Sequence, residues 1–296
     1  MVQTVARRNL VLAMAEGGSG NSMVRISPLA AKMAAAQGID LGSLPAIRGR
    51  IMAAHIAAAA AAHATKAGCS APSPERRVPM SGMRKAIAAR MRESAAISPT
   101  VSFDITVDIT AQKRAQDELS KNGVQISSMD IIVKAVSTAL LEHPNLNSTV
   151  DGDHIIRRDY VNMGITVALD DGLLVPVLNN SHAKTLAQIS SEIQDLTGKA
   201  RNGTLSPDAL NGGTFTIFDL GMFDIESFTP IINQPHVAIL GVNKITDTPL
   251  LINGHLSVRQ IMKLSLTADH RAVDGALAAM FLSTLKRYLE QPALIA

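Results

Sequence analysis

The sequence is poor in residues that would indicate several common classes of protein. It has no tryptophan, only 3% aromatic residues and a single cysteine, Cys69. One cysteine cannot form an intramolecular disulfide and is typical of a reducing compartment, so we expect a cytoplasmic protein. The net charge of +3 is too small to favour nucleic acid, and no apolar run reaches the ~20 residues of a membrane span. The sequence therefore predicts neither a nucleic-acid partner nor a membrane anchor.

The N-terminal part begins with a weakly patterned leader, residues 1–24. Its two arginines precede an apolar stretch that is too short for a signal peptide, so we expect a disordered leader. Residues 25–56 follow as a small helical unit, in which Ser27-Pro28 is a helix-start signal and Gly38 a helix stop. Residues 57–75 are rich in alanine and proline and are predicted to be a linker, unless the alanines extend the preceding helix as far as Lys66.

The large domain covers residues 76–296. Period-two alternation predicts strands, whereas apolar residues at helical spacing predict helices. The strands are expected at residues 101–107, 161–167, 173–177, 213–218, 237–242 and 262–268, and the helices at residues 83–91, 127–140, 186–196 and 275–289. Because these elements alternate without regular βαβ spacing, we expect a layered α/β fold rather than a doubly wound sheet.

The chemical signal lies at the end of the last predicted strand. Residues 262–268 alternate apolar and polar side chains, and His270 follows this half-buried strand, with Asp274 four residues further on. Taken alone, such a pair is more often a surface contact at a turn. Metal ligation would need a third ligand at a suitable spacing, which the sequence does not offer, so no metal site is predicted.

The whole string DHRAVDG, residues 269–275, decides between these alternatives. It closely resembles the active-site motif of the acyltransferase component of the pyruvate, acetoin and related 2-oxo acid dehydrogenase complexes. The resemblance covers nearly all of residues 78–296 and includes residues 80–88, 143–147, 172–177, 212–217 and 220–223. It implies a chloramphenicol acetyltransferase-like domain with a mixed sheet, and coenzyme A (CoA) as a substrate.

The resemblance also implies a role for each residue of the motif. His270 would be the general base that removes the thiol proton of CoA or dihydrolipoamide. A free thiol with a pKa of about 8.5 is mostly protonated at neutral pH, and an imidazole with a pKa of about 6.5 is a suitable acceptor. Asp274 would pair with Arg114 and so brace the active-site loop, although Arg114 on its own is typical of a solvated helix surface.

The chain departs from the family pattern at Phe218. The family normally has a serine here, in Thr-Ile-Ser-Asn-Leu-Gly, whose hydroxyl donates to the oxyanion. Losing one such donor typically costs about 10²–10³ in rate. Two hypotheses follow: an acyltransferase that moves an acetyl-type group between dihydrolipoamide and CoA, or a catalytically impaired core subunit of the same complex. A small-molecule acyltransferase of the chloramphenicol type is a third, against which the N-terminal unit and linker argue.

Residues 25–56 resemble the peripheral subunit-binding domain of the family, which recruits the decarboxylase and dihydrolipoyl dehydrogenase components. The loop before Gly49 is shortened and His55 replaces the usual aspartate, while Arg48 and Arg50 remain to contact an acidic partner unless they are simply solvated. No lipoyl-type lysine hairpin is found upstream, so the lipoyl group is expected from another domain or chain. The family forms trimers with active sites between subunits, so we expect a homotrimer or larger core in which His270 faces the Phe218 strand of a neighbour.

Overall fold

In the computed structural model of the chain, the residues described are 3–7, 10–14, 24–44, 50–67, 75–121, 123, 125–169 and 172–295. The chain divides into two compact units, Met1–Pro79 and Met80–Ala296, and each is described by itself. None of the helices in these ranges is long and apolar enough to cross a membrane.

The first unit is a small body of two helices and a short sheet. The Ser27 hydroxyl accepts the N–H of Ala30 (3.2 Å) and begins α1 (Pro28–Gln37), which ends at Gly38 in the left-handed region (φ 65°). Both helix signals are therefore confirmed. The second helix, α2 (Ala53–Ala67), packs against α1, and the two bury a small cluster of Ile26, Ala30, Ala34, Ile51 and Ile56.

The structure differs from the predicted disordered leader. β1 (Gln3–Arg7) and β2 (Leu10–Met14) form an antiparallel pair, and β2 also pairs with β3 (Val24–Ile26), which lies beside β4 (Arg50–Ile51). Aliphatic residues dominate β2, so its pairing is in line with β propensity. The alanines of the expected linker extend α2 as far as Ala67, as the alternative interpretation allowed. Residues 68–74 lie outside the described residues, and the domain boundaries stay a prediction.

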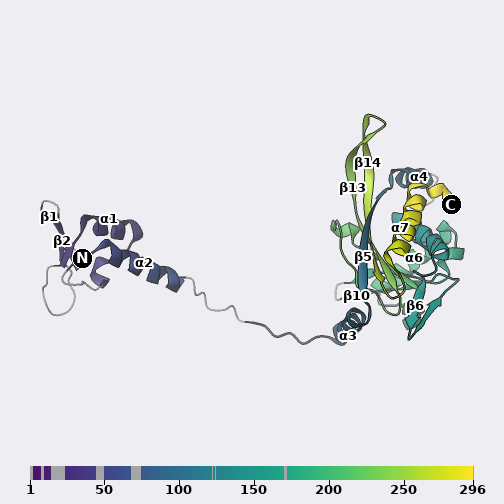
Figure 1. Ribbon diagram of the computed structural model, residues 1–296, viewed down its shortest axis with the longest axis horizontal. Helices are drawn as coiled ribbons and strands as arrows, with labels where there is room; N and C mark the ends of the chain where they lie inside the picture. Colours follow the sequence, from purple (N-terminus) through teal and green to yellow (C-terminus); the bar gives the residue numbers. More distant parts are fainter. Residues whose placement is uncertain are drawn as a thin grey trace. The chain divides into compact units, whose positions relative to one another are not determined.

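The second unit is built on a six-stranded mixed sheet (Figure 1). In spatial order its strands are β11 (Val177–Leu178), β8 (Met163–Ile165), β12 (Phe215–Asp219), β13 (Ala238–Ile252), β14 (His255–Asp269) and β5 (Thr100–Asp108). The three strands β8, β12 and β13 run parallel, and the other neighbours are antiparallel. The predicted α/β class with a mixed sheet is confirmed. Two small hairpins pair β6 (Ser148–Asp151) with β7 (His154–Arg157) and β9 (Val167–Leu169) with β10 (Gly172–Leu174).

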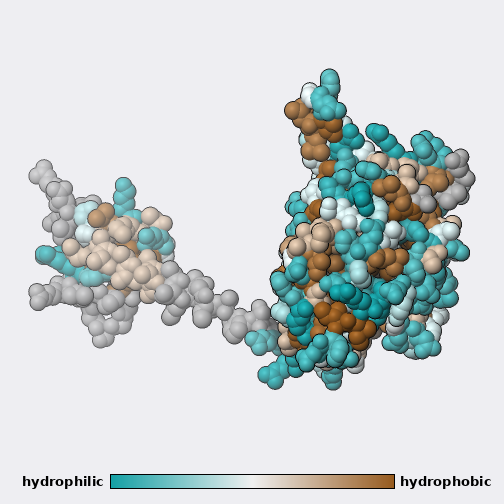
Figure 2. Space-filling model, turned by 45° about the vertical axis from the view of Figure 1, so that its right-hand side comes forward, coloured by the Kyte–Doolittle hydropathy of each residue, from teal (hydrophilic) through white to brown (hydrophobic). Residues whose placement is uncertain are grey.

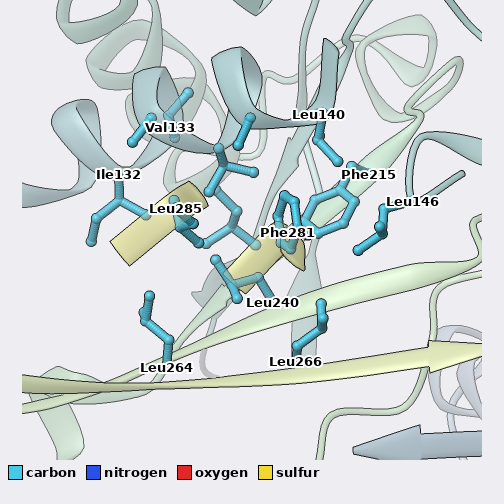
Figure 3. Close-up of a cluster of buried hydrophobic side chains, with 14 of the residues drawn as sticks. Ile132, Val133, Leu140, Leu146, Phe215, Leu240, Leu264, Leu266, Phe281 and Leu285 are labelled. Atoms are coloured by element: carbon cyan, nitrogen blue, oxygen red, sulfur yellow. The ribbon is translucent and has the colours of Figure 1, made fainter. Parts of the chain in front are cut away.

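Helices close the core on one face of this sheet. These helices are α5 (Ser128–Glu142), α6 (Leu186–Arg201) and α7 (Gly275–Glu290), and α4 (Thr110–Lys121) packs against α5 and α7. α3 (Gly82–Ile97) lies outside this core and buries only Ser94. Leu240, Leu264 and Leu266 of the strands face Phe281 of α7 and the apolar side of α5 (Figure 3). In this core that lacks tryptophan, aliphatic burial at roughly 1.5–3 kcal/mol per side chain is the main stabilising term.

β13 and β14 extend far beyond the sheet as a two-stranded arm (Figure 1). Their register shifts between Val242 and Ile245, then continues to a turn in which Asn253 (φ 51°) and Gly254 (φ 79°) are both left-handed. Such an Asn-Gly turn favours a two-residue hairpin. The outer part of this arm was not predicted, and it carries Leu251 and Leu256, which are 75% and 76% exposed. Figure 2 shows hydrophobic surface near the tip of the arm.

Candidate active site

His270 is the first residue after β14, as predicted from the strand pattern. Its backbone N–H donates to the carbonyl of Pro99 (2.9 Å), and the N–H of Asp269 donates to the carbonyl of Val237 (2.7 Å). The backbone is therefore held by two segments that lie far away in the sequence. The His270 side chain is exposed, so a fixed backbone presents an accessible imidazole.

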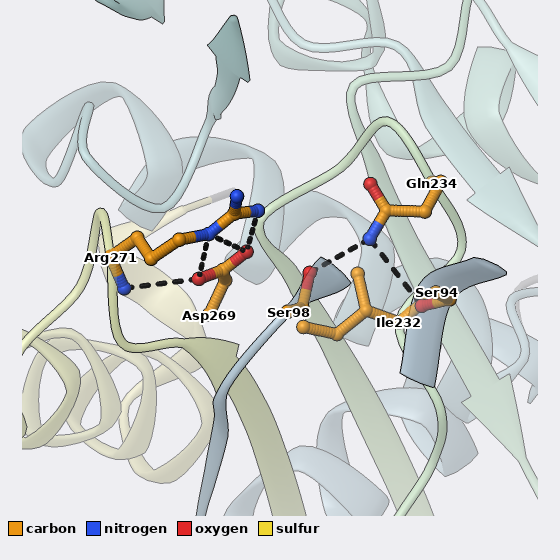
Figure 4. Close-up of polar contacts among 6 residues, drawn as sticks. All are labelled: Ser94, Ser98, Ile232, Gln234, Asp269 and Arg271. Carbon is orange, nitrogen blue, oxygen red and sulfur yellow. Dashed lines mark hydrogen bonds and ion pairs between the residues drawn. The ribbon is translucent and has the colours of Figure 1, made fainter. Parts of the chain in front are cut away.

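Asp269 closes the turn around His270. Its carboxylate is 1% exposed and accepts the backbone N–H of Arg271 (3.0 Å) as well as guanidinium N–H groups at 2.6–3.1 Å (Figure 4). Burial alone would raise the pKa of Asp269, but hydrogen bonds from Arg271 and Ser98 outweigh burial and lower it. The carboxylate therefore stays charged, and a charge-assisted ion pair spans the residues on either side of His270.

A chain of hydrogen bonds connects this turn to α3 and to the segment before β13. Gln234 Nε2 donates to the hydroxyl of Ser98 (2.8 Å), the residue that caps α3, and to that of Ser94 (3.4 Å). The Ser94 hydroxyl in turn donates to the carbonyl of Ile232 (2.7 Å) (Figure 4). Sequence reasoning missed Ser98 and Gln234, because no local pattern links residues whose partners are 136 positions apart.

The predicted ion pair between Asp274 and Arg114 is not formed in the described part of this chain. Asp274 instead accepts the N–H of Leu277 (2.9 Å) and is the N-cap of α7. The first turn of a helix has N–H groups without helical partners, and an aspartate at this position satisfies one of them. Arg114 lies exposed on α4. The ion pair beside His270 is the one between Asp269 and Arg271.

Phe218 lies half-buried on β12 and packs on a second aromatic ring. Its ring stands edge-on to Phe228, with centroids 5.3 Å apart and an interplanar angle of 84°. Phe228 also covers Gly241 on β13 so closely that a Cβ there would lie 2.8 Å from the ring, which explains the glycine. The position at which the family pattern has a serine is therefore filled by an aromatic pair without a hydroxyl.

The sheet register separates Phe218 from His270 within one chain. Phe218 lies opposite Gly241, and Gly241 lies opposite Ser265 on β14. His270 is five residues beyond Ser265, a distance of roughly 16 Å at ~3.3 Å per residue. A side chain at position 218 is therefore too far away to contact a group held at His270 of the same chain.

A cavity of about 340 Å³ lies beside the Phe218 end of β12. Three methionines contribute to its apolar wall, Met129, Met222 and Met262, and Asp219 and Asn243 contribute polar atoms. Burial raises the pKa of Asp219, and the N–H that it accepts from Gly221 (2.8 Å) only partly opposes this. The ion pair between Lys244 and Asp224 (3.3 Å) also lines this cavity, so its wall combines apolar side chains with charged ones.

The fold and the site place the chain among the acyltransferases. Residues 72–296 match the family described as 2-oxoacid dehydrogenases acyltransferase (catalytic domain), and the chain belongs to this family. It is 39% identical over 280 residues to the dihydrolipoyllysine-residue acetyltransferase component of the acetoin cleaving system of Bacillus subtilis (strain 168). That alignment covers 91% of this chain and 70% of the relative.

Two solved structures superimpose with a TM-score of 0.72, and each alignment covers 76% of this chain and 95% of the other. One is the cubic core of the pyruvate dehydrogenase multienzyme complex, at 35% identity. The other is the dihydrolipoamide acetyltransferase of Azotobacter vinelandii, at 36% identity, which was studied for the role of a serine, a histidine and an asparagine in catalysis. There the serine precedes the histidine by 52 residues and the asparagine follows it by four. Phe218 and Asp274 have the same separations from His270.

Proposed function

We propose that this chain is the acyltransferase subunit of a 2-oxo acid dehydrogenase complex of the pyruvate or acetoin type. It moves an acetyl-type group between dihydrolipoamide and CoA, with the lipoyl group supplied by another domain or chain. The observation that carries the proposal is the exposed imidazole of His270 on a backbone fixed by Asp269 and Arg271. A cytoplasmic location is part of the proposal and is supported by the single cysteine.

The proposed reaction uses His270 as a general base and then as a general acid. The imidazole takes the proton of the attacking thiol, and the thiolate adds to the thioester carbonyl carbon. The tetrahedral oxyanion collapses by breaking the bond to the first sulfur, and the imidazolium returns the proton to that leaving thiolate. Asp269 acts as a positioning residue. Asp274 needs no charge for its capping role, which agrees with the asparagine that the Azotobacter vinelandii relative has at this separation.

We also propose that each active site forms between two subunits of a homotrimer or a larger core. The roughly 16 Å between Phe218 and His270 along the sheet supports this proposal, because the two positions can flank one thioester only if they come from different chains. The exposed leucines of the arm, Leu251 and Leu256, offer apolar surface for such an assembly. The relative in the cubic core belongs to an assembly of this kind.

Residues 25–56 are proposed to recruit the decarboxylase and dihydrolipoyl dehydrogenase components. Leu29 and Met52 are exposed on this unit, and so is Arg50, two residues before Met52. His55 accepts the N–H of Met52 (3.2 Å), so its imidazole performs the capping that a carboxylate would perform at the start of α2. The replacement of the usual aspartate therefore leaves the helix start intact. Arg48 lies outside the described residues.

Phe218 favours a second candidate, a core subunit that assembles but transfers acyl groups slowly. A phenylalanine cannot donate to the oxyanion, and its ring is already packed against Phe228. This candidate shares the fold, the assembly and the partners of the first. The two differ only in the rate of transfer.

The rate can be measured with acetyl-CoA and free dihydrolipoamide as substrates. We expect His270→Ala to lower the rate by about 10²–10⁴, the usual contribution of a positioned general base. His154→Ala removes an exposed histidine of β7 and serves as the matched control, which should leave the rate unchanged. If the parent protein is no faster than His270→Ala, the enzyme is ruled out and the slow core subunit remains.

A further inference from the structure

A second cavity, of about 230 Å³, lies beside β8 and β11 and the segment that precedes β13. This is the end of the sheet at which β14 ends, since β14 runs antiparallel to β13. Its polar side chains come from Arg90 of α3, Arg158, Asn211, Asn233 and His236, and among the described residues no acidic side chain lines it. His236 precedes Val237, whose carbonyl accepts the N–H of Asp269 (2.7 Å). The cavity is therefore a close neighbour of the His270 turn.

Both arginines of this cavity lack a carboxylate partner in the described part of the chain. Nη1 of Arg158 is buried and has no hydrogen-bond acceptor. Arg90 donates to Oδ1 of Asn233 (3.2 Å) and to the carbonyl of Gln234 (3.4 Å), which are neutral groups. A buried guanidinium N–H without an acceptor is costly, and an anion in the cavity would remove that cost.

His236 leaves the positive charge of the cavity in place and adds none. It is 5% exposed, and its Nδ1 lies 3.0 Å from the hydroxyl of Thr216. Burial, helped by the charges of Arg158 and Arg90 and opposed by a hydrogen bond with the backbone of Gly213, lowers the pKa of His236 to about 4. At neutral pH the ring is uncharged, so the charge of the cavity comes from the two guanidinium groups and favours a negatively charged ligand.

We propose that this cavity binds a phosphate group. Arginine recognises the oxygens of phosphate through paired N–H donors, and Asn211 and Asn233 offer further amide groups. The volume equals roughly seven or eight waters at about 30 Å³ each, which suits a phosphoryl group but is too small for a whole nucleotide coenzyme. The phosphate is either free or carried by CoA, and the second source rests on the proposed function.

Phosphate in the cavity would also be linked to the His270 turn. Gln234 lines the cavity and donates to Ser98 (2.8 Å), and Ser98 hydrogen-bonds to Asp269. One side chain therefore contributes to both the cavity wall and the support of the turn.

Titration of the full chain with inorganic phosphate, by calorimetry, tests the cavity without any need for activity. We expect Arg158→Gln and Arg90→Gln each to lower the affinity for phosphate at least tenfold. A hydrogen bond to a charged group typically strengthens binding by more than a factor of ten. Arg201→Gln, which removes an exposed arginine at the end of α6, is the matched control and should bind as the parent does. Arg158→Lys keeps the charge and should retain part of the affinity, which separates loss of the ligand site from loss of the fold. In the parent, phosphate should also raise the pKa of His236, measured by NMR.

Kinetics with acetyl-CoA and acetylpantetheine distinguish the two sources. If CoA carries the phosphate, Arg158→Gln raises KM for acetyl-CoA about tenfold and leaves KM for acetylpantetheine, which has no phosphate, unchanged. If only the affinity for inorganic phosphate falls, the ligand is a free phosphate. If neither phosphate affinity nor KM for acetyl-CoA responds to the two arginines, the proposal is overturned. If the parent protein is inactive but still binds phosphate through Arg158, the proposed transferase function is contradicted and the phosphate site is not.

Discussion

The two ends of the candidate active site differ in what fills the position closest to the proposed chemistry. At the His270 end, a buried carboxylate, a guanidinium and Ser98 form a connected polar network. At the Phe218 end, two aromatic rings pack edge-to-face beside a cavity whose wall carries three methionines. The proposed base, His270, therefore has a complete set of supporting contacts, whereas an aromatic side chain fills the position at which the family pattern has a serine.

This difference shows that the residue at position 218 can change without any change in the contacts that support His270. The polar network of Asp269 is local to one chain, so it persists whatever stands at position 218. An aromatic ring at position 218 is held by Phe228 and by the space above Gly241, and it needs no polar partner. Within one chain the two ends lie roughly 16 Å apart, so a substitution at one end should leave the fold of the other end unchanged.

The largest effect is expected from Phe218→Ser. A hydroxyl at this position restores a donor to the oxyanion, so transfer from acetyl-CoA to dihydrolipoamide should become about 10²–10³ times faster. Phe218→Ala is the matched control, because it opens the same space without a hydroxyl. If the two variants have the same rate, the gain comes from space alone. An unchanged rate in Phe218→Ser would indicate that another donor, such as the nearby hydroxyl of Ser227, already serves the oxyanion.

Asp269→Asn should have the next largest effect. It removes the charge that holds Arg271, and a displacement of the His270 backbone by about 1 Å would lower kcat by up to about 10²-fold with little change in KM. Arg271→Gln should give a smaller loss, since that side chain is partly exposed. The folded-state pKa of Asp269 is depressed, so its stabilising contribution is present at neutral pH and is lost as the pH falls below its usual range near 3.8. An unchanged kcat in Asp269→Asn would contradict the positioning role.

The smallest of these effects is a pH dependence of stability at the polar end. The pKa of His236 falls from 6.5 to about 4 on folding. The unfolded chain therefore binds a proton that the folded chain does not, and stability decreases as the pH falls through this window. Between pH 7 and pH 5 the free energy of unfolding, measured with urea, should fall by about 2 kcal/mol. His236→Gln should abolish that part of the pH dependence, and an equal slope in this variant would refute the assignment.

Local signals in the sequence predicted much of the fold. Ser27 and Gly38 mark helix ends by capping, which depends only on neighbouring residues, and each was found where expected. The strand before His270 was predicted from its period-two pattern. The arm was missed, although its Asn253-Gly254 turn was a usable signal, because its exposed apolar residues do not follow the pattern of a half-buried strand.

The polar support of the site could not be predicted, because its contacts connect distant segments. Ser98, Gln234 and Asp269 come together only after α3, the segment before β13 and the end of β14 have packed. The same applies to Arg90 and Arg158, which share a cavity but no local motif. The expected pairing of Asp274 with Arg114 came from resemblance alone, and the need of α7 for an N-cap gives Asp274 another partner.

In the proposed assembly, the arm formed by β13 and β14 would make the stability of this protein depend on its own concentration. Leucines that are three-quarters exposed favour any state in which another surface covers them. By mass action, dilution then shifts the population toward separate chains, in which His270 and a neighbour's Phe218 strand no longer meet. The specific activity of the protein should therefore fall on dilution before the individual chains unfold.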